Sequence, residues 1–407
     1  MASDTSSAVH PGTDLAEHAR ALRRVHDAVM GGSRPSRDLR PLVSRSWSRV
    51  LAIGLDPTHA NARDPLPWSE VERRRAGSPL ALVVQEIRAV LTSVAEASRF
   101  IVVVTDAEGV ILWREGSAGV LRRADGLGFT EGAIWTEEHV GTNAIGTALA
   151  EEAPVQLFSA EHFEQGQHGW YCTAFPVHDP RTGTFVGVVD VSGPALMLHP
   201  ALLAHVDTAT RLAEARLWRR HEEALSRLRR SADPVLATTS GPLLLVDDEG
   251  WVAHYSGVLV RDRIAAPRSD RPLHVPGLGL CLPERLGEGW LVRPDRRGAT
   301  LRAHLATSGA EAVLEVAGSD GDGWRAQLSP RHATILRLIA GAGAEGLTAA
   351  ALSRLLFGDD EHQVTVRAEM SRLRRAIGAL VATGPYRIAD GVDFTCPPVQ
   401  EGESVAP

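Results

Sequence analysis

The stretch HVGTNAIGTALA, residues 139–150, contains the residues that most resemble a phosphate-binding loop. Gly141 and Gly146 have the glycine spacing of a Walker-type loop, Gly-x4-Gly-Lys-Ser/Thr. Thr147 stands where that loop requires lysine, and the preceding letters WTEEH are not typical of the strand that leads into it. Without the lysine ammonium, nothing would reach the β- and γ-phosphates. The stretch does not contain a Gly-x-Gly-x-x-Gly dinucleotide fingerprint either, so it argues against nucleotide hydrolysis.

Histidine, cysteine and glutamate side chains in the same region are residue types that bind metals or carry redox chemistry. They are Glu138, His139, His162, His168, Cys172 and His178. The spacing of His168 and Cys172 suits a helix, but Cys172 is expected to begin a strand. The alternative is that these polar groups form hydrogen bonds around a pocket or loop, and we favour it over a metal site. A redox role for Cys172 would require an exposed thiol of lowered pKa.

Common catalytic arrangements can be recognised in a sequence as paired carboxylates, a nucleophile elbow or a Ser/His/Asp order. We find no such arrangement that supports catalysis in this sequence. We therefore predict that the chain is not an enzyme and that it uses no cofactor.

Length and composition exclude several classes of protein. The chain has 407 residues, which predicts more than one domain. Its net charge of −7 excludes a globally basic nucleic-acid coat, but charge acts locally and a small DNA-binding module stays compatible with it. Cys172, Cys281 and Cys396 are scattered and odd in number, so no disulfide framework is expected. Because no apolar run approaches the about 20 residues of a membrane span and no signal peptide is evident, we expect a cytoplasmic protein without membrane contact.

The candidate sensor residues lie in a region, residues 1–198, whose sequence pattern changes between helical and strand spacing. Residues 1–77 are expected to form an N-terminal helical segment, and 78–98 an amphipathic helix with one apolar side. Residues 100–116 and 171–192 each predict two strands about a turn. The residues between these hairpins, with HVGTNAIGTALA on a helix capped by Thr142 or Asn143, complete an α/β sensor domain over 78–198.

The second half of the chain is expected to contain three further parts. Residues 199–232 predict a long connecting helix that pairs with a second copy, giving a homodimer, although burial within its own chain is nearly as well supported. A polar linker follows, and short strand-like pieces predict a small, mainly β module over 242–327. Residues 329–396 predict three short helices and a tight hairpin, which is the order of a winged helix-turn-helix domain. The fold class is therefore α/β multidomain, with an antiparallel sensor sheet.

The third of these helices, residues 363–380, has one apolar and one basic side. A buried stripe is predicted by apolar residues that repeat at helical spacing, namely Val366, Met370, Leu373, Ile377 and Leu380. The opposite side carries arginine and small residues, which a helix in the DNA major groove needs. A solvated arginine side on an ordinary helix is the alternative for this pattern alone.

The letters VRAEMSRLRRAI and GPYRI resemble the end of the winged-helix effector domain of response regulators of the OmpR/PhoB type. Ala376 replaces the usual lysine of that family, and Pro385 separates Gly384 from Tyr386, so phosphate contacts are expected to differ in detail. The resemblance implies binding of double-stranded DNA. The candidate DNA-contact residues, most of them from the basic side of the helix, are Thr365, Arg367, Ser371, Arg372, Arg374, Arg375 and Arg387.

Residues of the opening region closely resemble the GAF-type sensory region of bacterial acetoin- and glycerol-catabolism regulators. The matching positions are Trp135, Glu137, Gly141 through Leu149, Glu161–Phe163, Cys172, Ala174, Pro176, Asp179, Gly187–Val188, Asp190 and Ser192–Gly193. With the segment RSWSRVLAIGLDP, the likeness spans roughly residues 40–230. In that family the region senses a small molecule and signals to an AAA+ ATPase. No Walker A sequence or ATPase-length segment is seen here, so the resemblance implies sensing without ATP-driven promoter opening.

A GAF-type pocket is expected to be concave and mainly apolar, with a few polar groups that orient an organic effector. The candidate ligand-binding residues are Trp135, Asn143, His162, Trp170, Cys172 and Asp190. Asp190 could instead hold the end of its own strand.

Together these observations predict a bacterial one-component transcription regulator that senses a small molecule and binds DNA through a C-terminal winged helix. One alternative is a signalling adaptor whose C-terminal helices bind a protein instead of DNA. Another is an enzyme acting in the GAF-like pocket, whose turnover would depend on Cys172.

Overall fold

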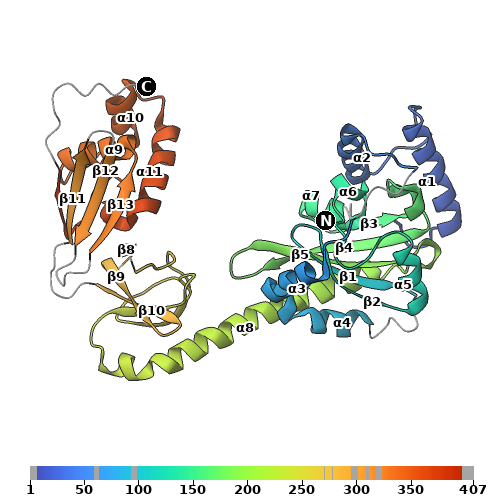
Figure 1. Ribbon diagram of the computed structural model, residues 1–407, viewed down its shortest axis with the longest axis horizontal. Helices are drawn as coiled ribbons and strands as arrows, with labels where there is room; N and C mark the ends of the chain where they lie inside the picture. The colour runs from blue at the N-terminus through green and yellow to red at the C-terminus, as the bar shows by residue number, and fades with distance from the viewer. Residues whose placement is uncertain are drawn as a thin grey trace. The chain divides into compact units, whose positions relative to one another are not determined.

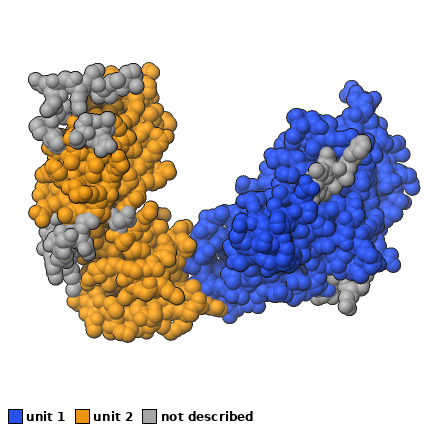
Figure 2. Space-filling model, in the orientation of Figure 1, with its two compact units in different colours: residues 1–221 blue, residues 222–407 orange. Residues whose placement is uncertain are grey.

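The computed structural model describes residues 7–58, 64–92, 99–269, 271–276, 278–294, 301–308, 311–317 and 323–396. The chain divides into two compact units, Met1–His221 and Glu222–Pro407, which Figure 2 shows in separate colours. Each unit has hydrophobic clusters of its own. In the described part of the chain, no helix combines the length and apolar character needed to cross a bilayer.

The N-terminal unit is built on a five-stranded sheet of order β2-β1-β5-β4-β3, in which all neighbours are antiparallel (Figure 1). The strands are β1 Ile101–Asp106, β2 Ile111–Gly116, β3 Val155–Phe158, β4 Trp170–Asp179 and β5 Thr184–Pro194. Successive side chains of a strand point to opposite faces. Val102 and Val104 therefore join one hydrophobic cluster, while Ile101 and Val103 join another. Helices cover both faces, which explains why residues 101–104 of β1 are apolar on both sides.

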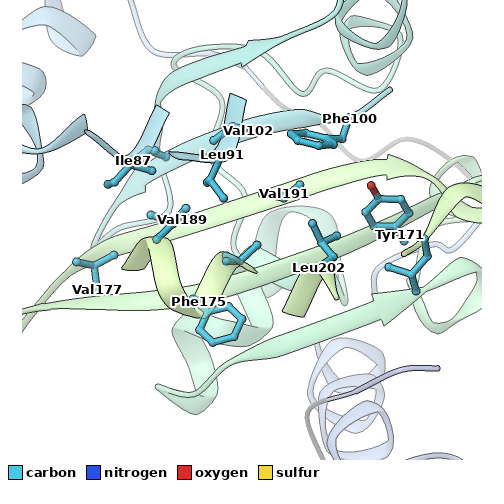
Figure 3. Close-up of a cluster of buried hydrophobic side chains, with 14 of the residues drawn as sticks. Ile87, Leu91, Phe100, Val102, Tyr171, Phe175, Val177, Val189, Val191 and Leu202 are labelled. Carbon is cyan, nitrogen blue, oxygen red and sulfur yellow. The ribbon is translucent and has the colours of Figure 1, made fainter. Parts of the chain in front are cut away.

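One face of this sheet is covered by α4, Val84–Thr92, and by the start of α8, Leu202–Thr238. Figure 3 shows Ile87 and Leu91 of α4 over the valines of β1 and β5, with Leu202 of α8 in the same cluster. The helix expected at 78–98 begins instead as a 3-10 turn, η1 Pro79–Leu82. The α-helix starts only after Val83, whose backbone angles are not helical. Residues 93–98 lie outside the described residues.

The other face is covered by α7, Ala144–Glu151, together with α2, α5 and α6. The bounds are α2 Pro41–Ile53, α5 Ala118–Asp125 and α6 Glu137–Val140. The remaining helices of this unit are α1 Leu15–Met30 and α3 Trp68–Gly77. The segment 1–77 was expected as a separate region, but Leu22 of α1 and Trp47 of α2 are buried in the same clusters as the sheet. The N-terminal helices are therefore part of this unit's packing.

Helix α8 is longer than the expected 199–232 and continues through much of the expected linker, past Pro234. Val206, Ala213 and other residues of its first half are buried in the N-terminal unit. Leu228 and Ala232 are buried against Leu245 of the C-terminal unit. Leu236, beyond the proline, packs against the same cluster, so the last turns share this apolar contact although the local composition looks like that of a loop.

The C-terminal unit contains two larger sheets, so the module expected at 242–327 is divided. The first sheet has the order β7-β6-β10-β9-β8, and the second has the order β13-β12-β11-β16. The strands of the first are β6 Leu243–Val246, β7 Val252–Ser256, β8 Leu273–Val275, β9 Gly279–Leu286 and β10 Gly289–Pro294. Those of the second are β11 Leu301–Ser308, β12 Glu311–Ala317, β13 Gly323–Leu328 and β16 Val392–Thr395.

Three helices follow β13 and share the core of the second sheet, whose strand β16 comes after them in the chain. They are α9 Pro330–Gly341, α10 Ala349–Phe357 and α11 Gln363–Ile377. Leu305 and Leu314 of the sheet lie in one cluster with Ile335 of α9 and Leu373 of α11. The short η5, Gly378–Leu380, leads to the two-stranded sheet of β14 Val381–Ala382 and β15 Arg387–Ile388. Strands 301–328 therefore belong with the C-terminal helices, because their apolar face is buried against them.

Candidate ligand pocket and candidate nucleic-acid interface

The HVGTNAIGTALA stretch forms the end of α6, a tight connection and α7. Asn143 caps α7, since its Oδ1 accepts a hydrogen bond from the Gly146 amide at 2.9 Å and its Nδ2 donates to the Gly141 carbonyl at 2.9 Å. Gly141 has φ +73°, and a Cβ there would lie 2.5 Å from the Phe163 ring. A Cβ on Gly146 would lie 2.6 Å from the Glu137 backbone nitrogen. The two glycines therefore permit close packing and do not line a phosphate site.

Glu137, the first residue of α6, links α2 to α6 and α7. This nearly buried carboxylate accepts hydrogen bonds from Ser46 at 2.5 Å, from Thr147 at 2.8 Å and from Arg49 at 2.7 and 2.9 Å. Arg49 also binds Glu151 at 2.8 Å. The buried charge is thus compensated by an ion pair and by hydroxyl donors, as burial of a carboxylate requires.

A small pocket lies between α7 and the sheet. Five of the six candidate ligand residues line it, namely Trp135, Asn143, Trp170, Cys172 and Asp190. Sequence reasoning missed the other lining residues, Leu127, Phe129, Ala144, Ile145, Gln167 and Ser192. The cavity volume is about 20 Å³, which is room for about one water molecule. Any larger ligand must displace the surrounding side chains.

The polar end of this pocket is formed by residues from β4 and β5. Cys172 pairs with Ser192 and Ala174 with Asp190 across the two strands, so their side chains share the face that α7 covers. The Ser192 hydroxyl donates to Asp190 Oδ2 at 2.5 Å. Asp190 Oδ1 is buried and has no hydrogen-bond partner among the described residues. Burial raises the pKa of Asp190 to about 7, although the Ser192 hydroxyl opposes this shift.

His162 does not line the cavity but supports it from behind Cys172. Its Nε2 lies 3.2 Å from Cys172 Sγ, and its Nδ1 lies 2.9 Å from the Ser159 carbonyl oxygen. Burial lowers the pKa of His162 to about 4 and raises the pKa of the Cys172 thiol well above its usual range. A neutral imidazole that donates from Nδ1 therefore accepts the S–H of Cys172 at Nε2. The geometry is that of a neutral pair and differs from the thiolate that redox chemistry would need.

The other candidate histidines make contacts of their own. His168 stacks edge-on against His26 of α1, with ring centroids 4.5 Å apart. His139 Nδ1 lies 2.7 Å from the Thr136 hydroxyl, and His178 faces Glu214. Among the described residues, no group of three or more histidine, cysteine, aspartate or glutamate side chains is arranged to hold a metal ion.

Sequence reasoning missed two residues that contact the segment 161–163, namely His26 of α1 and Arg40, which directly precedes α2. His26 Nε2 lies 2.9 Å from the Phe163 carbonyl oxygen. Arg40 donates to both carboxylate oxygens of Glu161, at 2.7 and 3.0 Å. These partners are more than 100 residues apart in the chain, and no local pattern connects them.

Helix α11 has the two sides that its spacing predicts. Val366, Met370, Leu373 and Ile377 are buried in the core of the second sheet. The candidate DNA-contact residues Thr365, Arg367, Ser371, Arg372, Arg374 and Arg375 are exposed on the same helix.

Two of the candidate DNA-contact arginines are held in ion pairs within the chain. Arg372 donates to Glu369 at 2.7 Å, and Arg387 donates to both carboxylate oxygens of Asp390 at 2.5 and 2.9 Å. Arg387 lies on β15, in the hairpin that follows α11. Arg367, Ser371, Arg374 and Arg375 together line a groove on the surface of α11.

Comparison with known proteins gives the relationships of the whole chain and of its N-terminal unit. Residues 42–215 match the family model described as MimR, N-terminal domain. The acetoin dehydrogenase operon transcriptional activator AcoR of Bacillus subtilis is 32% identical over 203 residues, which are 49% of this chain and 33% of AcoR. The chain thus matches about a third of that activator's length.

A solved structure also resembles part of the chain. The Escherichia coli DhaR(N)-DhaL complex contains a chain that aligns with a TM-score of 0.44 at 18% identity, over 63% of this chain and 100% of that one.

The 47.3 kDa protein of the thcA 5′ region of Rhodococcus erythropolis is similar over a longer range. It is 32% identical over 389 residues, which are 94% of this chain and 72% of that protein. On this near full-length similarity, the chain belongs to the same family as the Rhodococcus erythropolis protein.

Proposed function

We propose that the protein is a one-component transcription regulator. Residues 78–198 act as a GAF-like sensor of a small molecule, and residues 329–396 act as a winged helix that binds double-stranded DNA. The matched family model and the named activator among the relatives support a role in transcription. The similarity to AcoR covers a third of that protein, so it does not extend to the whole activator. We therefore use it to support a sensory role for the N-terminal unit and not the DNA-binding part of the proposal.

The observation that carries the DNA-binding proposal is the two-sided character of α11. Its apolar residues are buried, while Arg367, Arg374 and Arg375 project from the exposed side. Two helices with side-chain caps precede it, begun by Ser329 and Thr348, and a two-stranded hairpin follows it. A buried spine of this kind holds a helix rigid while its arginines bind guanine edges and phosphates.

The pocket over β4 and β5 supports the sensing proposal. Its walls are aromatic and aliphatic, and its polar end presents the unpartnered oxygen of Asp190 within the described structure. That combination is typical of sites for small organic molecules. Because the cavity holds about one water molecule, an effector must move side chains such as Trp135 or Ile145 to enter. Effector binding would thereby favour a second arrangement of the sensor.

The DNA-binding proposal is tested with the full chain and duplex fragments of the source genome. Fluorescence anisotropy is measured from 50 to 300 mM salt for the wild type, for Arg367→Ala with Arg375→Ala, and for Arg302→Ala. Arg302 is exposed on β11, away from α11, and serves as the control. We expect the double variant to lose at least tenfold in affinity and about two units of salt slope, since each lost phosphate contact removes about 0.9.

Two results would contradict this proposal. One is a wild-type chain without salt-dependent DNA binding, and the other is a double variant that binds as tightly as the control. Capture of a protein partner that survives high salt, without a DNA footprint, would instead favour the signalling adaptor.

A further inference from the structure

The pocket between α7 and the sheet contains one carboxylate, Asp190, and its described lining residues include no arginine, lysine or histidine. Asp190 is fully buried, and its Oδ1 lacks a hydrogen-bond partner within the described structure. Burial raises its pKa, while the Ser192 hydroxyl and the Thr173 amide oppose that shift. When Asp190 is ionised, its charge is therefore compensated by neutral donors alone. Such a state is unfavourable for a buried carboxylate, and a positive partner would relieve it.

The groups around Asp190 do not supply that positive charge. Three other titratable side chains lie beside it or behind its neighbours, namely Tyr171, Cys172 and His162. Burial raises the pKa of the phenol and of the thiol, and it lowers the pKa of the imidazole to about 4, so all three are neutral between pH 5.5 and 8. Val103 pairs with Asp190 across β1 and is apolar. Arg123 of α5 lies over the Trp170 ring, 5.2 Å from its centroid, and does not line the pocket.

The walls and the size of the pocket suit a small organic cation. Phe129, Trp135 and Trp170 line it together with Leu127 and Ile145. Aromatic rings attract cations, and aliphatic side chains favour an alkyl group. A primary ammonium group is compact and carries three N–H donors, so it fits a cavity of about 20 Å³ that has room for about one water molecule. Only the alkyl part of such a ligand has to displace side chains.

We infer that the effector is a small primary alkylammonium ion, whose head group donates a hydrogen bond to Asp190 Oδ1 and whose alkyl group lies among the aromatic and aliphatic walls. This inference rests on the proposed sensing role of residues 78–198 and names the chemical class of the effector. A positive charge beside a carboxylate favours its ionised form. Because the pKa of Asp190 is about 7 in the empty pocket, binding near neutral pH releases the proton that part of the molecules carry there.

The test titrates the full chain by calorimetry with primary alkylammonium ions from methylammonium to isobutylammonium, and with the alcohols of the same carbon skeletons, which carry no charge. We expect an amine to bind more tightly than its alcohol. Its affinity should rise about thirtyfold from pH 5.5 to 8, because the ionised share of a carboxyl with a pKa of about 7 rises by that factor. At pH 7, heats measured in buffers of different ionisation enthalpy should show the release of about half a proton.

Two substitutions test the role of the carboxylate. Asp190→Asn keeps the size of the side chain but cannot become charged, so it should lower amine affinity at least tenfold and remove the pH dependence. Asp207→Asn is the matched control, because Asp207 pairs with Arg211 on α8 and does not line the pocket. It should bind amines like the wild type. Proton release by the wild type needs no variant, so the inference is tested even where Asp190→Asn does not fold.

Several results would overturn the inference. An alcohol that binds as tightly as its amine would leave the sensing proposal standing and assign the pocket to uncharged effectors. Amine binding that is the same at pH 5.5 and 8, without proton release, would show that the head group does not meet Asp190. Tetramethylammonium, which has the charge but no N–H donor, should bind more weakly than methylammonium, and the reverse order would exclude the hydrogen bond to Oδ1. If no amine in the series binds, the inference fails, while the anisotropy experiment still decides DNA binding separately.

Discussion

At the residue scale, Asp190 is the side chain whose chemistry depends most on its surroundings. It is fully buried, and burial raises its pKa to about 7, so near neutral pH it is protonated in a large share of molecules. A protonated carboxyl can donate a hydrogen bond, and an ionised one can only accept. The pocket therefore presents a group whose role changes close to physiological pH.

Asp190→Asn should reveal this shift in the pH dependence of stability. Because the folded-state pKa exceeds the unfolded value of 3.8, the aspartate's contribution is present below about pH 4 and is lost as pH rises to about 7. The free energy of unfolding of the wild type relative to the variant should fall by up to roughly 4 kcal/mol between pH 4 and 8.

Urea unfolding followed by tryptophan fluorescence at several pH values measures this difference. His162 and His168 have pKa values lowered to about 4 and about 3, so they act in the opposite sense. They are present in both proteins, and their effect largely cancels in the comparison. A difference that does not change with pH would show that Asp190 ionises normally.

At the element scale, the connection from α6 to α7 depends on close backbone contact. Gly146→Ala should destabilise the N-terminal unit by about 1–3 kcal/mol, because the new Cβ would meet the backbone of Thr136 and Glu137 at 2.7 and 2.6 Å. Gly119→Ala is the control, since Gly119 lies in α5 and a Cβ there meets nothing within 4 Å. That variant should be neutral or more stable by up to about 1 kcal/mol. Equal melting temperatures for the two variants would contradict the packing role of Gly146.

Local sequence patterns predicted helix starts and buried helix sides best, because capping residues and apolar spacing act within a few residues of the chain. Ser329 and Thr348 begin helices with side-chain caps, and Asn143 caps α7 as its position before an apolar run suggests. The stripe of α11 is buried because its spacing leaves only one apolar side.

Features that depend on distant contacts could not be predicted in the same way. Nothing around His26 or Arg40 indicates that they reach the segment 161–163. Helix α8 continues past Pro234, where Leu236 packs against the cluster of Ala232 and Leu245, a strand residue of the following sheet. Pocket residues such as Phe129 have apolar side chains that look like ordinary core until the fold encloses them.

At the scale of the whole molecule, α8 was expected to mediate a homodimer, and its burial pattern limits how it could do so. Leu202, Val206 and Leu217 are buried in their own unit, so they are not available to a second copy. On α8, Leu212 is 40% exposed. Two residues that precede the start of this helix, Leu196 and Met197, are 60% and 48% exposed. Large apolar side chains exposed along one segment are the residues from which a partner surface is built.

We predict that the protein is a dimer whose contact includes Leu212, because DNA readers of this kind commonly bind two half-sites as symmetric pairs. Leu212→Glu should then halve the molar mass measured by sedimentation equilibrium and weaken DNA binding, since a carboxylate in an apolar contact costs free energy unless it is paired. Leu259→Glu is the matched control, because Leu259 is 96% exposed in the C-terminal unit. A wild-type monomer, or a dimer that both substitutions leave intact, would exclude this contact and favour α8 as an element internal to one chain.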